Sequence, residues 1–524
     1  MAIELSDIMF TNSSDVVPPS GVEQIAIFGG NVNTLAGDDR INGVNDVITD
    51  ITTGEYSFLN LYGTLNTDSG NDIITGIFNQ NEPDNYSFPF FPNGITNIGS
   101  DDPDQGGYAT IDTGDGNDTI TGNFNYLDSA SVWGHGIYNI RGTIDTGGGN
   151  DLITGINRNY GEGIYNEIGT IDTGSGNDII TGISQLSGIV SVHSTINTGD
   201  GNDTIMGTTT ASSPYTAILI AGGSVDTGKG NDIITGTSAY VGIVSGVRTF
   251  ESSLNTGDGN DTITGTGKLT GIENSSVLNT GNGDDALISH GNFFNTEVGR
   301  VFLGDGNDSI TADTDLPDLV LKNFKFIDTG DGNDKITSTG AIYNSGNINT
   351  GNGEDFIISQ GEFFNHGRVI LGDGNDLLFT NTITNTISSN SYLATIETGN
   401  GNDIIISSGV IYNYDEGTIN TGNGNDFIIA NGGFGSDENS SGSVFLGDGE
   451  DGIKGFGSGE FYGGNGNDTL ELTPGSYTVG ISGTLVNFTK DSTMMITSEF
   501  ERLRANNTTY DFTSLTAGQI ITVP

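Results

Sequence analysis

One ten-residue pattern recurs through most of this chain and constrains its fold more than any other feature. The clearest copy is Thr113–Gly122, T-G-D-G-N-D-T-I-T-G, and its core, G-x-G-x-D, occurs fifteen times. Ile or Leu stands two places after every one of the fifteen aspartates, and Ile, Val, Leu or Phe stands seven places before it. We therefore expect each copy to form an apolar strand, a glycine turn and a second apolar strand.

The copies are too close together for globular domains to lie between them. From Asp118 to Asp451 successive aspartates are 21 to 33 residues apart, and a fixed period in this range is typical of solenoids. A further apolar segment ending in Asn, such as Gly136–Asn139, precedes many of the turns and indicates a third strand with Asn at a corner. The spacing predicts an all-β solenoid of about 17 coils.

Two of these coils are degenerate. They are expected around Asp46 and Asp72, where Val44 and Asp68 stand in place of glycines. Ion binding in these coils should be weak or absent, because the turn has lost residues that adopt positive φ without strain.

The charge balance selects for cationic ligands. The chain has 15 basic and 67 acidic residues, a formal charge of −52, and no cysteine. This argues against nucleic acid and anionic membranes as partners, since both require Lys and Arg. It also excludes disulfides and thiol-bound metals. Disorder is the alternative for an acidic, glycine-rich chain, chiefly without calcium, although every repeat carries apolar residues at fixed offsets.

The turns have the chemistry of a calcium site. Ca²⁺ takes six to eight oxygen ligands, and a turn offers several carbonyl oxygens only when Gly114 and Gly116 keep Cβ atoms out of the way. Stacked turns would share ions, about one per gap between coils, so that folding depends on Ca²⁺. The candidate metal-ligating residues are Asp72, Asp118, Asp151, Asp178, Asp203, Asp232, Asp261, Asp285, Asp308, Asp334, Asp355, Asp376, Asp403, Asp426, Asp451 and Asp468.

These turns resemble the RTX (hemolysin-type) calcium-binding nonapeptide, G-G-x-G-x-D-x-U-x, over residues 114–470, and the phrase I-D-T-G-D-G-N-D is most similar to cyanobacterial members. The resemblance implies a right-handed parallel β-solenoid (β-roll or β-helix), calcium as the cofactor and export by a type I secretion apparatus to the outside of the cell. One difference is that family repeats run in tandem, whereas this chain has a single turn per coil and hence one calcium edge.

Three regions are predicted. Residues 1–30, with a strand at Ile25–Phe28, should cap the solenoid of residues 31–470, and residues 471–524 should form a C-terminal β module that serves as cap and secretion signal. Residues 1–30 lack the pattern of a Sec signal peptide, and no apolar run is long enough to span a membrane. An aromatic segment at 81–107 should leave the stack, either to pack back on it or to contact a partner.

Several of the later coils carry an apolar residue where others have Asp or Asn on the outward face. These residues are Phe302, Ile370 and Phe445. Strand alternation places them outward, either beneath a loop or in a lateral contact row.

A structural function fits these features best. The four histidines, His135, His193, His290 and His366, lie in different coils with no nucleophile at a recognisable spacing, so catalysis is not expected. We expect a secreted, calcium-binding rod in an extracellular layer, sheath or self-assembling fibre at the cell surface. The alternatives are a calcium-dependent adhesin or carbohydrate-binding surface protein and, less favoured, a carbohydrate-active enzyme. Ice binding is disfavoured because the turn edge is charged.

Overall fold

The computed structural model describes all residues except 1–2, 20–22, 46–55, 81–91, 101–106, 127–132, 211–214, 240, 246–251, 315–318, 388–393, 415 and 436–441. Chain contacts define two compact units, and the division into residues 1–30, 31–470 and 471–524 stays a prediction. The first comprises Met1–Asn282 and Leu287–Gly291, and the second comprises Gly283–Ala286 and Asn292–Pro524. The described residues contain strands and short 3₁₀ turns but no α-helix, and hence no helix able to cross a membrane.

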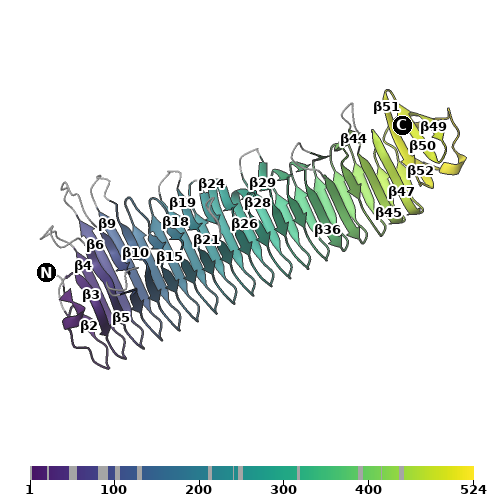
Figure 1. Cartoon of the computed structure of the whole chain (residues 1–524). Helices are drawn as coiled ribbons and strands as arrows, with labels where there is room; N and C mark the ends of the chain where they lie inside the picture. The colour runs from purple at the N-terminus through teal and green to yellow at the C-terminus, as the bar shows by residue number, and fades with distance from the viewer. Residues whose placement is uncertain are drawn as a thin grey trace. The chain divides into compact units, whose positions relative to one another are not determined.

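Each unit is a parallel β-solenoid, as predicted. A coil contains up to three strands, and each pairs in parallel with the corresponding strand of the next coil (Figure 1). For example, Ile111 pairs with Ile144, and Ile144 pairs with Ile171. The strands therefore form three rows: row 1 precedes the glycine turn, row 2 follows it, and row 3 completes the coil.

In the first unit the rows contain the following strands. Row 1 consists of β8 (Ala109–Asp112), β11 (Gly142–Asp145), β14 (Thr170–Asp172), β17 (Thr195–Asn197), β20 (Ser224–Asp226), β23 (Ser253–Asn255) and β25 (Val277–Asn279). Row 2 consists of β2 (Val16–Val17), β4 (Arg40–Asn45), β6 (Ile73–Gln80), β9 (Thr119–Tyr126), β12 (Leu152–Asn157), β15 (Ile179–Ser184), β18 (Thr204–Thr209) and β21 (Ile233–Thr237). Row 3 consists of β1 (Ile3–Glu4), β7 (Asn93–Ile98), β10 (His135–Ile140), β13 (Ile164–Glu167), β16 (Ile189–Val192), β19 (Thr216–Ala221) and β22 (Val241–Ser245). Three long strands serve two rows: β3 (Ile25–Asn33) and β5 (Tyr56–Asn66) serve rows 3 and 1, and β24 (Thr262–Asn274) serves rows 2 and 3.

The second unit repeats this arrangement. Row 1 consists of β27 (Arg300–Phe302), β30 (Phe326–Asp328), β33 (Asn347–Asn349), β36 (Arg368–Asp373), β39 (Thr395–Asn400), β42 (Thr418–Asn420), β45 (Ser443–Gly449) and β47 (Gly459–Gly466). Row 2 consists of β28 (Ser309–Asp313), β31 (Lys335–Ser338), β34 (Phe356–Ser359), β37 (Leu377–Thr380), β40 (Ile404–Ser407), β43 (Phe427–Ala430), β46 (Gly452–Lys454) and β48 (Thr469–Glu471). Row 3 consists of the end of β26 (Ala286–Asn295), β29 (Leu319–Asn323), β32 (Ala341–Asn344), β35 (Glu362–Asn365), β38 (Thr382–Thr386), β41 (Ile411–Tyr414) and β44 (Phe434–Gly435).

The core consists of three columns of apolar side chains, one from each row. Ile144 in row 1, Ile153 in row 2 and Ile164 in row 3 are all completely buried. Strand alternation explains their position, because the residues on either side of each of them point outward. The sequence pattern therefore predicted the inward-facing residues on both sides of the turn correctly.

A buried column of asparagines lies at the corner after row 3. In the first unit Asn97 Nδ2 donates to Asn139 Oδ1 at 2.8 Å, and Asn139 Nδ2 donates to Asn166 Oδ1 at 2.7 Å. The second unit repeats the bond from coil to coil through Asn295, Asn323, Asn344, Asn365, Asn385 and Asn413. This confirms the predicted corner Asn and satisfies polar groups that would otherwise be buried without partners.

The C-terminal residues first leave the stack in an antiparallel hairpin and then rejoin it. The strands β51 (Thr493–Ser498) and β52 (Arg502–Ala505) pair in parallel with β47 and β48. Antiparallel pairs then join β49 (Gly475–Ser482) to β50 (Leu485–Lys490) and β54 (Ile520–Val523), β50 to β51, and β52 to β53 (Thr508–Asp511). The repeat pattern therefore ends at Glu471, but rows 1 and 2 each gain one more strand, β51 and β52, from the non-repeat C-terminal segment.

Candidate metal centre

The glycine turns stack so closely that no side chain fits at either glycine. A Cβ added to Gly149 would lie 1.5 Å from the carbonyl oxygen of Gly116 in the preceding coil, and a Cβ on Gly147 would lie 2.1 Å from that of Gly114. Both residues also have positive φ, +142° and +79°. The carbonyls of the two glycines thus point along the stack at the next turn, so the turn edge of each unit is lined by backbone oxygens, as predicted.

The predicted metal-ligating aspartates form a buried column directly behind these turns, which we call the aspartate ladder. Each carboxylate accepts a hydrogen bond at Oδ1 from the backbone N–H of the ladder aspartate one coil earlier. Asp118 N donates to Asp151 Oδ1, and Asp151 N donates to Asp178 Oδ1, both at 2.8 Å. In the second unit Asp308 N donates to Asp334 Oδ1 at 2.8 Å. The side chain therefore joins neighbouring coils.

The second carboxylate oxygen is different, because in most ladder aspartates it is buried without a hydrogen-bond partner. This holds for Oδ2 of thirteen residues: Asp118, Asp151, Asp178, Asp203, Asp232, Asp308, Asp334, Asp355, Asp376, Asp403, Asp426, Asp451 and Asp468. Asp261 and Asp285 occupy the same ladder position and are equally buried. A buried carboxylate oxygen without a partner is costly, so its repetition requires an explanation.

Burial makes the charged form of these carboxyl groups unfavourable. Desolvation raises the pKa of Asp118 from 3.8 to about 7 and that of Asp308 to about 8, with smaller contributions from neighbouring aspartates. The backbone N–H groups, and for Asp118 also the nearby Thr113 hydroxyl, lower the pKa but are outweighed. Cations beside the ladder would therefore favour its ionised form at neutral pH.

The first two ladder positions differ from all later ones. The Thr67 hydroxyl donates to Asp72 Oδ2 at 2.6 Å, and the Thr34 hydroxyl donates to Asp39 Oδ2. Their Oδ1 atoms accept from the backbone of Asp39 and Asp15, so all four oxygens have partners. In a later coil Thr173 contacts a backbone carbonyl of the next coil, as Thr67 also does, but its hydroxyl lacks hydrogen-bonding geometry to Asp178 Oδ2 and only partly offsets the rise that burial causes in the pKa of that carboxyl. This supports the expectation of weak or absent ion binding in the degenerate coils.

The register of the first coil corrects the sequence alignment. The ladder residue is Asp39, and Leu35 (φ 69°) and Gly37 (φ 142°) adopt the conformations of the two turn glycines. Val44, predicted to stand in place of a turn glycine, instead pairs with Ile77 within a strand. Asp46 lies outside the described residues. Asp68 does replace a turn glycine, with φ 65°, as predicted.

A second, exposed ladder of side chains runs beside the aspartates, and the sequence analysis missed it. The residue before each ladder aspartate, usually Asn, accepts a bond from the backbone N–H of its counterpart one coil later. Asn150 N donates to Asn117 Oδ1 and Asn177 N to Asn150 Oδ1, both at 2.7 Å. The signal was present, because N-D recurs in most of the turns.

The ladder is closed at its end by a residue from outside the repeat. Glu501, in the C-terminal segment, accepts a bond from Asp468 N at Oε2, 2.8 Å away. It takes the place that the next aspartate fills elsewhere. No repeat pattern marks this residue, so the sequence did not reveal it.

The atoms at the ladder fit a hard divalent cation. The turn offers glycine carbonyls and one carboxylate per coil, which are all oxygen donors of the kind that Ca²⁺ prefers. Within the described residues no group of three or more His, Cys, Asp or Glu side chains is placed to hold a metal ion. The oxygens available at each turn thus combine a carboxylate with the backbone.

The other residues singled out in the sequence are not brought together with the ladder. His135 pairs with Glu162 (Nδ1–Oε2 3.0 Å), and His366 Nδ1 contacts the carbonyl of Thr386 at 2.8 Å. Phe445 faces outward as expected and stacks on Tyr462, with ring centroids 4.8 Å apart. Most of the aromatic segment at 81–107 lies outside the described residues.

Comparison with known proteins yields only a structural resemblance. No family model and no curated protein matches the chain. One solved structure that does match is a hyperactive, Ca²⁺-dependent, β-helical antifreeze protein from an Antarctic bacterium. It is 21% identical over 80% of this chain and 84% of its own, with a TM-score of 0.25. A TM-score this low supports no inference about function.

Proposed function

We propose that this protein is a secreted calcium-binding structural protein, in which Ca²⁺ bound along the aspartate ladder stabilises a β-solenoid of an extracellular layer, sheath or fibre. The observation that carries the proposal is the row of buried Oδ2 atoms without hydrogen-bond partners. Calcium would supply positive charge to carboxylates that burial otherwise drives toward protonation. The proposal assigns no catalytic activity to the chain.

Secretion rests on the resemblance of the turns to RTX repeats, which implies a type I apparatus. It is consistent with a need for calcium, because a chain that folds only with bound Ca²⁺ would remain unfolded at the low free calcium of a cell interior and fold outside.

The test is a measurement of metal uptake and its effect on folding. Protein freed of metal should take up about one Ca²⁺ per intact glycine turn in titration calorimetry, and elemental analysis should find the same ratio. Circular dichroism should show loss of β-structure in EGTA at pH 8 and recovery on adding calcium, whereas Mg²⁺ should not replace it. Absence of calcium uptake, or an unchanged spectrum in EGTA, would refute the proposal.

A second candidate function, saccharide binding, is favoured by a hollow in the second unit. Its lining residues are Arg300, Phe302, Phe324, Lys325, Phe326, Ser345, Gly346 and Asn347, and its volume is about 540 Å³. The lining has aromatic rings and two cations but no carboxylate, in a chain with 67 acidic residues. Concave, aromatic-lined sites with few polar groups are typical of small-ligand sites. Calorimetry with oligogalacturonate against a neutral oligosaccharide of equal length tests it: uptake of the acidic sugar supports this function, and no uptake refutes it.

A further inference from the structure

The outer face of row 2 in the second unit is apolar over four consecutive coils. Two outward-facing residues from each of β34, β37, β40 and β43 form it, and we call them the apolar stripe: Phe356, Ile358, Leu377, Phe379, Ile404, Ile406, Phe427 and Ile429. They lie in two straight columns, because Phe356 pairs with Leu377, Leu377 with Ile404, and Ile404 with Phe427.

The core does not require these residues. The inward residues of the same strands, such as Ile357, Leu378 and Ile405, are completely buried, whereas Phe379, Ile404 and Phe427 are 37, 38 and 49% exposed. Solvent-facing strand positions are ordinarily polar. The stripe therefore leaves large apolar side chains in water without a role in the solenoid itself.

The first unit provides an internal comparison. In its row 2 the second outward position is threonine in most coils, including Thr121, Thr154, Thr181 and Thr235. The second unit begins the same way with Thr311 and Thr337 and then changes to Ile358, Phe379, Ile406 and Ile429. The substitution is confined to four adjacent coils, which makes the stripe contiguous rather than scattered.

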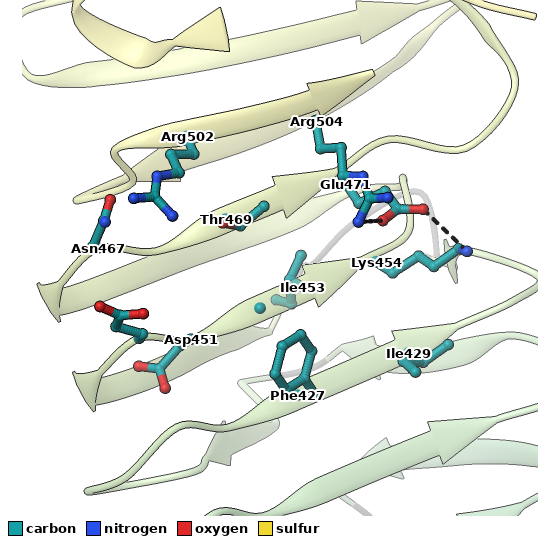
Figure 2. Close-up of a pocket in the computed structure, with 12 residues that line it drawn as sticks. Phe427, Ile429, Asp451, Ile453, Lys454, Asn467, Thr469, Glu471, Arg502 and Arg504 are labelled. Carbon is teal, nitrogen blue, oxygen red and sulfur yellow. Dashed lines mark ion pairs between the residues drawn. The ribbon is translucent and has the colours of Figure 1, made fainter. Parts of the chain in front are cut away.

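A cluster of charged residues closes the stripe at one end. After Phe427 and Ile429, the same two columns continue through Gly452 and Lys454, Thr469 and Glu471, and Arg502 and Arg504 (Figure 2). Lys454 Nζ lies 3.1 Å and Arg504 Nη1 3.5 Å from the two carboxylate oxygens of Glu471. Three of the chain's fifteen basic residues thus gather beside the stripe, around a hollow of about 430 Å³.

We propose that the apolar stripe is the contact surface for a second copy of this chain. Two such stripes have the same coil spacing of roughly 4.8 Å, so their side chains can interdigitate in register, as two packed sheets do. A contact of one patch with its own copy is isologous and closes as a pair. Contiguous apolar surface rimmed by polar residues is the usual mark of a protein contact.

The matching coil spacing favours a second copy over an unrelated apolar ligand, because only another solenoid repeats at the same interval. Two copies that each carry a formal charge of −52 repel one another. Lys454, Arg502 and Arg504 lie beside the stripe and reduce that repulsion where the copies would meet. The stripe is narrow for a stable interface, so we expect a dissociation constant on the order of micromolar.

Sedimentation equilibrium with saturating calcium tests the proposal. The wild-type chain of 54.5 kDa should approach twice that mass at about 100 µM. The triple variant Ile358→Thr, Phe379→Thr, Ile406→Thr restores the pattern of the first unit and should weaken association ~100-fold. Its circular dichroism and calcium stoichiometry should match the wild type, because the substituted side chains face solvent.

A matched variant in the first unit provides the control. Ile179→Thr, Met206→Thr, Ile233→Thr changes three outward-facing apolar side chains of row 2, which are 39, 36 and 45% exposed, and should associate like the wild type. The double variant Arg502→Ala, Arg504→Ala should bind ~10-fold more weakly and with less dependence on salt. A wild-type monomer at 100 µM, or equal association of the stripe variant and the wild type, would overturn the proposal. Neither outcome depends on whether the ladder binds calcium.

Discussion

At the scale of single residues, two backbone groups of the neighbouring coil, a carbonyl and an N–H, determine which residues each turn can contain. The second turn glycine is fixed by the carbonyl oxygen beneath it, and the ladder aspartate is fixed by the backbone N–H that its Oδ1 accepts. The middle residue of the turn is free to vary, because it joins neighbouring coils through its backbone, as Gly148 and Ser175 do. This explains why Asp, Asn, Ser, Gly and Lys all occur there.

The contrast between glycines of one turn can be tested directly. Gly149→Ala should destabilise the calcium-bound protein by about 3 kcal/mol or more, because its Cβ overlaps a carbonyl oxygen and the residue keeps φ near +142°. Gly148→Ala, where the nearest atoms lie 3.3 and 3.4 Å from the new Cβ, should change stability by less than about 0.5 kcal/mol. Denaturant unfolding of both variants gives the comparison, and equal effects would contradict the stacking argument.

An isosteric change at the ladder separates the role of charge from that of hydrogen bonding. Asp203→Asn keeps an oxygen for the N–H of Asp178 but removes the negative charge. We expect about one calcium ion fewer and a loss of about 1–3 kcal/mol with calcium present. In calcium-free buffer at pH 8 the same variant should be no less stable than the wild type, since it buries no charge.

Asp72→Asn is the matched control for that experiment. Both oxygens of Asp72 already have protein donors, Asp39 N and the Thr67 hydroxyl. Its substitution should leave the number of bound calcium ions unchanged. A loss of calcium equal to that of Asp203→Asn would show that the hydroxyl does not replace a metal contact.

At the scale of elements, each corner between rows is held by one kind of side chain. Asn344 illustrates the buried column: its Nδ2 donates to Asn365 Oδ1 at 2.9 Å and to Arg368 O at 3.2 Å, and its Oδ1 accepts from Asn323 at 2.9 Å. No water is needed to satisfy these groups, so the corner can be as dry as the core. The asparagine column therefore fixes the conformation of the corner as well as stabilising it.

Asn344→Ala should cost about 2–4 kcal/mol, because it leaves an amide of Asn323 and a carbonyl of Arg368 without their partners. Asn349→Ala, which removes an outward, partly exposed bond to Asp328, should cost less than about 1 kcal/mol. Urea unfolding in saturating calcium measures both. Similar losses for the two variants would indicate that burial of the column adds little.

The regular elements could be predicted from the sequence because the same residue pattern recurs at fixed offsets in many coils. The strands beside the turn, the inward Ile153 and the corner Asn139 all followed from fixed offsets. The first ladder coil could not be aligned, because Leu35 adopts the conformation of a glycine that the pattern requires. Glu501 could not be found, because tertiary pairing alone brings it to Asp468.

Features that depend on the direction of a side chain could not be predicted from the sequence either. The threonine before the turn is the same residue in many coils, yet Thr67 donates to Asp72 Oδ2 at 2.6 Å, whereas Asp178 Oδ2 receives no such bond from Thr173. The ladder aspartates were identified from spacing, whereas the unpartnered second oxygen, which carries the argument for a metal, became evident only in three dimensions.

At the scale of the whole molecule, the buried carboxyl groups link stability to pH. Burial raises the pKa of Asp118 to about 7 and of Asp308 to about 8, above the 3.8 of an exposed aspartate. A raised pKa in the folded state means that protonation favours folding. Without calcium, this stabilisation is complete below about pH 4 and is lost as the pH rises through 6 to 8.

Metal-free protein should therefore melt at a higher temperature at pH 5 than at pH 8. With saturating calcium the order should reverse, because the metal competes with protons for the same carboxylates. Thermal melts followed by circular dichroism at the two pH values, with and without calcium, measure this. A metal-free protein more stable at pH 8 than at pH 5 would contradict the assignment of buried, uncompensated carboxyl groups.

The glutamate that closes the aspartate ladder also bears on how copies of this protein can assemble. Because Glu501 occupies the acceptor position beyond Asp468, the terminal N–H is already bonded and offers no template onto which another molecule's turn could add. Growth by extending the spiral from that end is blocked by the chain's own side chain. We therefore expect copies of this protein to assemble through lateral contacts rather than by stacking onto this end of the second unit.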